Sequence, residues 1–533
     1  MLKRCVRSWC RRSPSGFGRT CSVAFAIGLY LAVGALQAAP PDLEARLDRL
    51  LARAPLARAS VGIYVERQSD GQPVYAHGAD RLLIPASNQK ILTALATLER
   101  FGPAHRFSTR IWAPKSIDRE GMVSELLVEG GGDPVMNSED WWRLAADLRH
   151  AGLRAVEGDV RVDDTLFDGP GWHPSWGSVS ARAYHAPVGA LTANYGTFFV
   201  SVWPQTTPGS SVLVDIDPPV AYLRLRNQAK TVSAKTRAKL TVDRVTERRS
   251  GGLVEEIIRV TGMVRRGDSV DRIPRSVLDP GLYAGSVLAY QLRANGIDVA
   301  GEVRRAPRGK EDLQLILDRP GRPVSEAVAL CLKYSNNSIA EILVKNLSAW
   351  EGVSAGEGPV RQGDWVTGIR ALRRELAKRG VDLGKASLVD GSGLSLQNRV
   401  TPRMLVRALS AGRKSFRSGP EFVAALPIAE RDGTLEKRLR GRSGRIRAKT
   451  GLLSDAAVIA LSGYAERANG EVLIFSILVN GHTGGSAAAM DAVDRLAETL
   501  LDAPIRQSAG GSKDSRDMPE ASRRVLGQAA RTD

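Results

Sequence analysis

The sequence predicts a mixed fold of the α+β/α/β type, with an antiparallel sheet faced by helices, an adjoining all-helical part, and a large, mostly β insertion. Two observations lead to this prediction. A hairpin pattern near the N-terminus has a counterpart near the C-terminus, and helical patterns border a middle region of short β-type runs. Because neither half could cover its apolar face alone, a single sheet built from both halves is the economical arrangement.

The first 39 residues are typical of a secretory signal. The first 20 residues carry six basic and no acidic side chains, and an apolar run from Cys21 to Ala38 follows. Small residues at Ala35 and Ala39 favour cleavage there. We therefore predict that residues 1–39 direct export to the periplasm of a bacterium and are then removed. An uncleaved anchor is the alternative, because about 18 apolar residues are at the lower limit for spanning a bilayer.

The next segments predict the first half of the fold. Residues 42–54 have helical apolar spacing, and two strand-like runs at 60–67 and 73–77 flank a Ser-Asp-Gly turn, which is a hairpin pattern. A long helical pattern begins near Ser87 and ends at Gly102.

The middle of the chain has a different character. From about residue 104 to 280, short β-rich runs alternate with Gly, Pro and Asp, so we predict a β-rich insertion over residues 102–282. Helical periodicity returns over 284–297 and over 324–347.

The C-terminal segments complete the predicted sheet. Apolar strands at 456–464 and 471–480 flank an Ala-Asn-Gly turn, and a helical pattern follows over 487–501. Residues 506–533 are polar and rich in Gly, Ser and Arg, which predicts a disordered tail. The predicted catalytic domain comprises residues 42–101 and 283–505.

Charge points to an anionic neighbour. The formal net charge of +18 falls to +12 once the six basic residues of the signal are removed. In an exported protein, anionic lipid headgroups or wall polymers are better partners than nucleic acid, because no recognition helix, zinc finger or aromatic RNA-binding motif is present. We expect peripheral association with an anionic membrane surface as one outcome, with a generally solvated basic surface as the alternative.

The sequence lacks the residues that several other classes of catalytic site require. The mature chain keeps one cysteine, Cys331, which has no Cys-x-x-Cys partner and is best interpreted as a buried apolar filler. The six histidines form no His-x-x-x-His pair, and no Gly-x-Ser-x-Gly occurs, so zinc peptidase and α/β-hydrolase sites are not indicated. We predict no metal and no cofactor.

The segment from Ser87 to Lys90 is the only Ser-x-x-Lys pattern in the chain. One helical turn places the two side chains next to each other. A serine hydroxyl attacks well only when a neighbour takes its proton, and a lysine can do so only if burial or another cation lowers its pKa. Taken alone, the pattern is also compatible with a helix cap and a solvated lysine.

Two further motifs stand at suggestive positions. A Ser-x-Asn triplet at 335–337 lies inside the predicted helical stretch, and its alternative is a polar turn between two helices. The sole Lys-Thr-Gly, at 449–451, directly precedes an apolar strand. A glycine at a strand edge lets a ligand approach the backbone, while Lys and Thr offer a charge and a hydroxyl to an anion. A surface lysine before a strand is its alternative.

The order Ser-x-x-Lys, Ser-x-Asn, Lys-Thr-Gly is the one shared by penicillin-binding proteins and class A β-lactamases. Over roughly residues 42–503 the chain resembles the class C low-molecular-mass penicillin-binding proteins, which are D-alanyl-D-alanine carboxypeptidases and endopeptidases. The resemblance implies a β-lactamase/transpeptidase-like domain with a large insertion between the first two motifs. The segments that carry it are LIPASNQKILTALATL, GGGDP, YHAPVGAL, RSVLDPGLYAG, KYSNNSIAE, LVDGSGLS, ERDGTLEKRL and RAKTGLL.

The resemblance also implies roles for single residues. Ser87 would be the nucleophile and Lys90 its general base, with Lys449 keeping Lys90 partly neutral by like-charge repulsion. Ser335 would relay a proton to the leaving D-alanine, and Asn337 would hydrogen-bond the peptide carbonyl of the substrate.

The Lys-Thr-Gly segment would bind the end of the substrate. Lys449 and Thr450 would hold the terminal carboxylate beside Gly451, and the backbone N–H groups of Ser87 and Leu452 would form the oxyanion hole. Leu452 departs from the small hydroxyl residue that family members often carry there, which leaves the substrate preference open. The segment Asp390-Gly391-Ser392-Gly393 resembles a family segment near the site, but by itself it is a turn, so we do not count it as catalytic.

We therefore expect a metal-independent serine D-Ala-D-Ala carboxypeptidase/endopeptidase that acts on peptidoglycan stem peptides and is acylated by penicillin and other β-lactams. The terminal D-alanine, the cross-link, or both are open as the cleaved bond. A β-lactamase is one alternative, and the long insertion and the absence of an identifiable deacylating Glu segment speak against it. A non-catalytic peptidoglycan-binding protein is another, and the three intact motifs speak against that.

Overall fold

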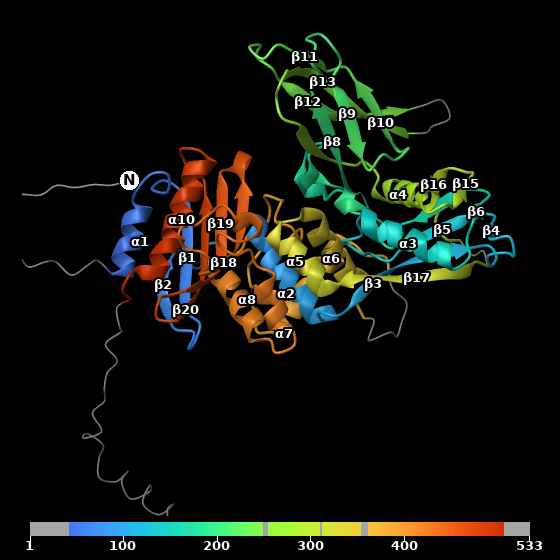
Figure 1. Ribbon diagram of the computed structural model, residues 1–533. Coiled ribbons are helices and arrows are strands. Elements are labelled where there is room, and N and C mark those ends of the chain that lie inside the picture. The colour runs from blue at the N-terminus through green and yellow to red at the C-terminus, as the bar shows by residue number, and fades with distance from the viewer. Residues whose placement is uncertain (1–41, 170, 249–253, 310–311, 353–360, 506–533) are drawn as a thin grey trace, which may run out of the picture. The chain divides into compact units, whose positions relative to one another are not determined.

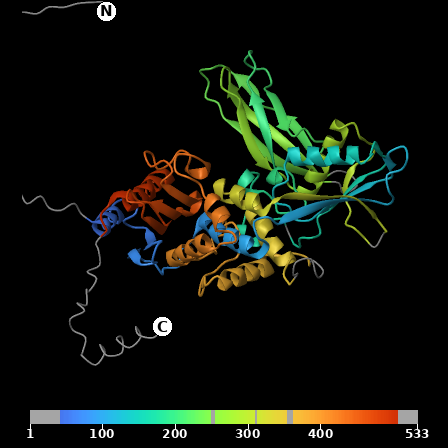
Figure 2. The ribbon, with the colours of Figure 1, turned by 60° about the horizontal axis from the view of Figure 1, so that its bottom comes forward.

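The predicted signal segment and the predicted C-terminal tail both lie outside the described residues. Among the helices that the structure describes, none has the length and apolar character needed to cross a membrane. The computed structural model describes residues 42–169, 171–248, 254–309, 312–352 and 361–505 (Figures 1 and 2).

A five-stranded antiparallel sheet joins the two ends of the described chain (Figure 1). Its order is β18-β19-β20-β1-β2, so the N-terminal hairpin adds to the C-terminal one through the pairing of β1 with β20. β18 is an edge strand of this sheet, and near its start the outer side of its backbone bonds residues 427–429. The strands are β1 (Ser60–Arg67), β2 (Pro73–His77), β18 (Ile446–Leu453), β19 (Val458–Glu466) and β20 (Val472–Asn480).

Helices cover both faces of this sheet because its strands are apolar on both sides. On one face, α1 (Leu43–Leu51) and α10 (Ser486–Asp502) pack against inward-facing residues such as Ile63. On the other face, α2 (Gln89–Phe101) and α8 (Pro402–Lys414) pack in a second core, visible in Figure 1.

The all-helical part surrounds α2, which is buried along almost its whole length. The sequence predicts continuous helical periodicity over 324–347, but the structure has two helices there. The chain turns at Ser335, whose φ of 58° is left-handed, and Asn336 then caps the next helix by accepting from the Ile339 N–H at 3.0 Å. The remaining helices are α5 (Val324–Lys333), α6 (Asn337–Ala349), α7 (Trp365–Lys378) and α9 (Gly419–Ala424).

In the part of the chain that the structure describes, the region between the first two motifs contains four sheets. The largest has the order β16-β7-β5-β3-β17, and the others are β14-β8-β9, β15-β6-β4, and β10-β13-β11 with β12 on β13. Their strands are β3 (Arg106–Ala113), β4 (Met122–Val123), β5 (Leu126–Gly130), β6 (Ala155–Val156), β7 (Val160–Asp163), β8 (Thr197–Trp203), β9 (Leu213–Asp217), β10 (Leu223–Asn227), β11 (Lys230–Val232), β12 (Leu240–Arg248), β13 (Val254–Arg265), β14 (Asp271–Ser276), β15 (Asp298–Val299), β16 (Val303–Arg305) and β17 (Gln314–Pro323).

Among its described residues, this region also has two α-helices. α3 (Ser138–His150), which we did not predict, starts with a capping box formed by Asn137 and Asp140 and buries Trp141. α4 (Pro280–Ala294) packs against α3 and β7. Helices therefore complete the core of what we predicted as a mostly β region.

Strand pairing bears on the extent of the insertion. β15, β16 and β17 pair with β6, β7 and β3 respectively, although residues 283–323 were predicted to lie in the catalytic domain. We propose that the insertion spans about residues 102–323 and that the chain returns to the helical part at Val324, where α5 begins.

Candidate active site

Ser87 lies in a short 3-10 turn, η1 (Ala86–Asn88), that leads directly into α2. The residue before it, Ala86, has a left-handed φ of 47°, a backbone conformation that costs free energy for a residue with a side chain. The buried Asn88 holds the turn against β19 by donating to Ser462 Oγ at 2.7 Å. The surrounding structure thus presents a half-buried Ser87 at the N-terminal end of α2.

Lys90 is fully buried one turn further along, and its Nζ makes three hydrogen bonds. It donates to Ser87 Oγ at 3.1 Å, to Asn337 Oδ1 at 2.7 Å and to the Ser392 carbonyl at 2.8 Å. Burial lowers the pKa of Lys90 to about 8, against the opposing pull of Cys331, Glu341 and Asp390. A substantial neutral fraction is therefore present near pH 8, and only the neutral amine can take a proton.

The Ser-x-Asn triplet lies at the junction of α5 and α6. Asn337 accepts from Lys90, and its Nδ2 donates to the Tyr184 carbonyl at 2.9 Å, so this side chain links the first motif to the inserted region. Ser335 is half-buried, and its hydroxyl makes no hydrogen bond to another residue within the described chain. The first two motifs therefore meet through Lys90 and Asn337.

The Lys-Thr-Gly triplet lies on the edge strand β18, which runs beside η1. Lys449 is fully buried and donates to the Thr450 carbonyl at 2.7 Å, and Thr450 Oγ1 donates to Thr434 Oγ1 at 2.8 Å. The Leu452 side chain is 43% exposed, so it projects beyond the core. A Cβ built on Gly451 would lie 3.1 Å from Ala86 Cβ, which places this strand against the residue before Ser87.

The electrostatics of the two lysines differ from the expected pattern. We expected repulsion from Lys449 to keep Lys90 partly neutral, but burial is the cause at Lys90. The pKa of Lys449 is held well below its usual value first by burial and then by the charge of Lys90. The repulsion between the two lysines therefore acts mainly on Lys449, whose protonated form it disfavours.

Gly451→Ala tests the close approach of the edge strand to η1. The new Cβ would lie 3.0 Å from Ala460 Cβ and 3.1 Å from Pro85 O, closer than ordinary contact. Because the strand must move away from Ala86, we expect penicillin acylation to slow by about tenfold or more. Acylation rates and thermal unfolding measured beside Leu453→Ala, which shortens a half-buried side chain on the same strand, check this. Equal rates in both variants would contradict it.

Sequence reasoning missed several residues around this site. Trp176 and Ser175, from the inserted region, donate to Asp390 Oδ2 at 2.9 Å and to Ser395 Oγ at 2.7 Å. The buried Glu341 lies one turn after Asn337 on α6 and accepts from the backbone of Gly391 and Ser392. The spacing of four residues between Asn337 and Glu341 was the one signal in the sequence that could have indicated a shared face.

A serine at the start of a helix, a buried lysine in contact with it and a second buried lysine on an adjacent edge strand are the arrangement of active-site serine enzymes of the penicillin-binding type. In the described residues, no three His, Cys, Asp or Glu side chains gather as metal ligands would. The chain belongs to the D-Ala-D-Ala carboxypeptidase 3 (S13) family, which matches residues 43–500.

Comparison with individual proteins agrees. The chain is 33% identical over 492 residues to the D-alanyl-D-alanine carboxypeptidase of Actinomadura sp. (strain R39), covering 89% of this chain and 87% of that relative. It is 25% identical over 439 residues to the D-alanyl-D-alanine carboxypeptidase DacB of Haemophilus influenzae, covering 80% of this chain and 86% of that one. The predicted enzyme class, a serine-type D-Ala-D-Ala carboxypeptidase, is confirmed.

The fold is that of a solved penicillin-binding protein. The crystal structure of penicillin binding protein 4 from Haemophilus influenzae matches with a TM-score of 0.70 at 22% identity, over 85% of this chain and 98% of that one. A second crystal structure of that protein, complexed with a β-lactam, matches with a TM-score of 0.67 at 22% identity, over the same 85% and 98%. The predicted fold class is confirmed.

Proposed function

We propose that the chain hydrolyses peptidoglycan stem peptides ending in D-Ala-D-Ala through an acyl-enzyme on Ser87, and that β-lactams acylate the same oxygen. The single observation that carries this proposal is the 3.1 Å contact between Ser87 Oγ and the fully buried Lys90 Nζ. A buried amine with a lowered pKa is the partner that a serine needs to become nucleophilic.

The proposed reaction has two steps. Neutral Lys90 takes the Ser87 proton while Oγ attacks the carbonyl carbon of the penultimate D-alanine. The peptide C–N bond breaks, the terminal D-alanine leaves with a proton relayed through Ser335, and the acyl group stays on Ser87. Water then attacks the ester and releases the shortened peptide, with the serine proton restored.

The rest of the site supports the transition state in this proposal. Backbone N–H groups of Ser87 and Leu452 form the oxyanion hole, at about 3 kcal/mol for each donor. Lys449 and Thr450 bind the terminal carboxylate, whose negative charge favours the protonated form of Lys449. Asn337 positions the substrate as well as Lys90.

Digestion of purified muropeptides tests the proposal and separates the open alternatives. Release of free D-alanine from monomers shows carboxypeptidase activity, and conversion of cross-linked dimers to monomers shows endopeptidase activity. Rapid turnover of penicillin in place of a long-lived adduct would favour the β-lactamase alternative. Peptidoglycan binding without any product, unchanged in Ser87→Ala, would favour the non-catalytic alternative.

We also propose that the chain is exported to the periplasm and associates peripherally with an anionic membrane surface. Residues 365–417 carry 12 Lys and Arg against 3 Asp and Glu, and Asp390 among these acids is fully buried. In this stretch Phe416, just after α8, has a fully exposed side chain. An exposed aromatic ring among cations fits the headgroup region of an anionic bilayer.

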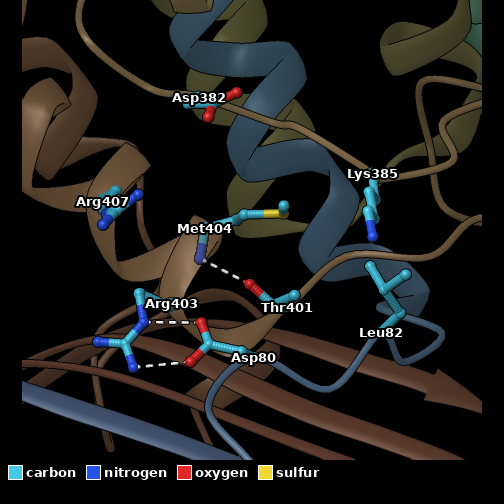
Figure 3. A pocket seen from close by; sticks show the side chains of 8 residues that line it. All are labelled: Asp80, Leu82, Asp382, Lys385, Thr401, Arg403, Met404 and Arg407. Carbon is cyan, nitrogen blue, oxygen red and sulfur yellow. Dashed lines mark hydrogen bonds and ion pairs between the residues drawn. The ribbon is translucent and has the colours of Figure 1, made fainter.

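Several of these cations lie along α8. Arg403 donates to Asp80 at 2.7 and 2.9 Å, and Figure 3 shows this pair with Arg407 and Lys385 around the same pocket. The charges of Lys414, Arg407 and Arg403 all act on the buried Glu66 of β1, so they lie on one side of the helix. We call this basic surface the α8 face and define it by Lys385, Arg403, Arg407 and Lys414, and Phe416 and Arg417 follow α8 directly in the sequence.

Charge reversal on the α8 face is expected to weaken binding to phosphatidylglycerol vesicles. For the chain starting at residue 40, we expect Arg407→Glu/Lys414→Glu to lower the partition constant at least tenfold, since each basic residue near such a surface contributes about 1 kcal/mol. Vesicle sedimentation at low and high salt measures this. Arg143→Glu/Arg272→Glu, which reverses two exposed charges in the inserted region, is the matched control. An equal loss in both pairs would assign the effect to overall charge and contradict a specific face.

A further inference from the structure

The loop at residues 390–395, which the sequence alone indicates is a simple turn, is hydrogen-bonded to the first turns of α2. Three consecutive backbone carbonyls of this loop accept hydrogen bonds from α2 side chains. The Asp390 carbonyl accepts from Gln89 Nε2 at 3.3 Å, the Gly391 carbonyl from Thr93 Oγ1 at 2.7 Å, and the Ser392 carbonyl from Lys90 Nζ at 2.8 Å. The position of Lys90 therefore depends on where the loop backbone is held.

Two fully buried carboxylates hold that backbone. Glu341 accepts from the Gly391 N–H at 3.0 Å and from the Ser392 N–H at 2.7 Å, and also from Trp365 Nε1 at 2.9 Å. Asp390 accepts at 2.7–2.9 Å from three further loop groups and from the inserted region. These donors are Gly393 N–H, Ser395 N–H, Asn398 Nδ2 and Trp176 Nε1.

The charge of Glu341 has no ion-pair partner within the described chain. Burial, and then the charge of the nearby Asp390, raise the pKa of Glu341 above its usual value. In its charged form Glu341 favours the protonated form of Lys90. The other ionisable groups that face these two residues are Cys331 of α5, Lys345 of α6 and Lys449 of β18.

We propose that Glu341 is a positioning residue for the acylation step, which holds the Gly391–Ser392 backbone so that the Ser392 carbonyl keeps the Lys90 amine on Ser87. Glu341 acts indirectly: it bonds the backbone N–H groups of Gly391 and Ser392, and the Ser392 carbonyl bonds the Lys90 amine. Glu341, Asn337 and Lys345 occur at intervals of four residues, so one stripe of α6 contacts Lys90, the loop and the Asp168 carbonyl in turn. This inference rests on the proposed role of Lys90 as the base.

The replacement Glu341→Gln separates positioning from simple support of the fold. The amide oxygen of the new side chain still accepts a hydrogen bond, but its NH2 group is a donor that faces the donor N–H groups around it. The loop must therefore shift, and we expect the acylation plateau at high pH to fall about 10- to 100-fold. Loss of the negative charge lowers the pKa of Lys90, so the acid-side inflection of the rate is expected to move down by about one pH unit. A residue that only supports the fold would lower the plateau without moving the inflection.

The experiment measures the second-order rate of acylation by a fluorescent penicillin from pH 5 to 10 in the whole mature chain. Glu341→Asp retains the charge, so its inflection is expected to stay in place while its plateau falls. Ser348→Ala is the matched control, because it removes a buried hydroxyl of the same helix that bonds only Asp364. It is expected to behave as the unmodified chain.

The outcomes are distinguishable. An unmodified chain that is not acylated overturns the proposed function itself, and one that is acylated without an inflection near pH 8 overturns the role of Lys90 on which this inference rests. A normal profile for the unmodified chain together with an unmoved inflection and plateau in Glu341→Gln overturns only the role of Glu341.

If Glu341→Gln does not fold, Trp365→Phe replaces it. That variant removes one donor to the Glu341 carboxylate, so the inflection is expected to move in the same direction by a smaller amount, and an unmoved one contradicts the proposal.

Discussion

Ser87→Ala is expected to abolish covalent labelling by penicillin and to reduce D-alanine release by about a million-fold, the scale of loss when the nucleophile of a serine hydrolase is removed. The reason is chemical, because no other hydroxyl contacts Lys90 Nζ in the described chain. Mass spectrometry of the intact protein after incubation with penicillin measures the adduct, and chromatography of muropeptides measures product.

The control for this prediction is a measurement that the fold of the variant stays intact. Removing one oxygen from a half-buried side chain leaves the packing of η1 in place, so the thermal unfolding midpoint of Ser87→Ala is expected to stay close to that of the unmodified chain. Full labelling of this variant would assign the nucleophile to another residue and end the proposal.

The rate of acylation is expected to rise with pH about tenfold per unit up to about pH 8 and then to level off. The sign follows from the chemistry. The active form of Lys90 is the neutral one, and burial lowers its pKa to about 8, so each unit below that value reduces the neutral fraction about tenfold. Stopped-flow acylation over a pH series measures the profile.

Lys90→Met completes this test. The thioether keeps the length of the side chain but takes no proton, so acylation is expected to fall about 10³-fold or more and to lose its dependence on pH near 8. A Lys90→Met profile with an unchanged inflection would assign the titrating group to another residue, with Lys449 as the nearest candidate.

The sheet and its three motifs could be predicted because their signals are local and strong. The strands at 60–67 and 471–480 are apolar on both faces, and in the structure residues 60–67 pair with residues 473–480. Ser87, Lys90 and the Lys-Thr-Gly strand follow fixed spacings that place them at a helix start and a strand edge. Patterns of this kind depend on residues that are close together in the sequence, so they can be recognised without knowledge of the rest of the fold.

The remaining features depend on partners far away in the sequence. β17 contains two prolines and a glycine, and its apolar and polar residues alternate only weakly. The sequence therefore has no clear pattern that predicts a strand paired with β3. The break at Ser335 needs a left-handed residue that is not glycine, which helical periodicity conceals. Glu341 and Asp390 bond mainly to backbone N–H groups, and every residue other than proline has one, so no particular residue type reveals them.

Cys331 provides a reporter for opening of the site. Its thiol is fully buried beside the two lysines, and burial raises its pKa to about 11, so in the folded chain it is uncharged and shielded from reagents. After removal of residues 1–39 it is the only cysteine in the sequence. The rate at which a maleimide modifies it therefore measures how often the interior of the molecule opens, in every variant considered above and without any engineered label.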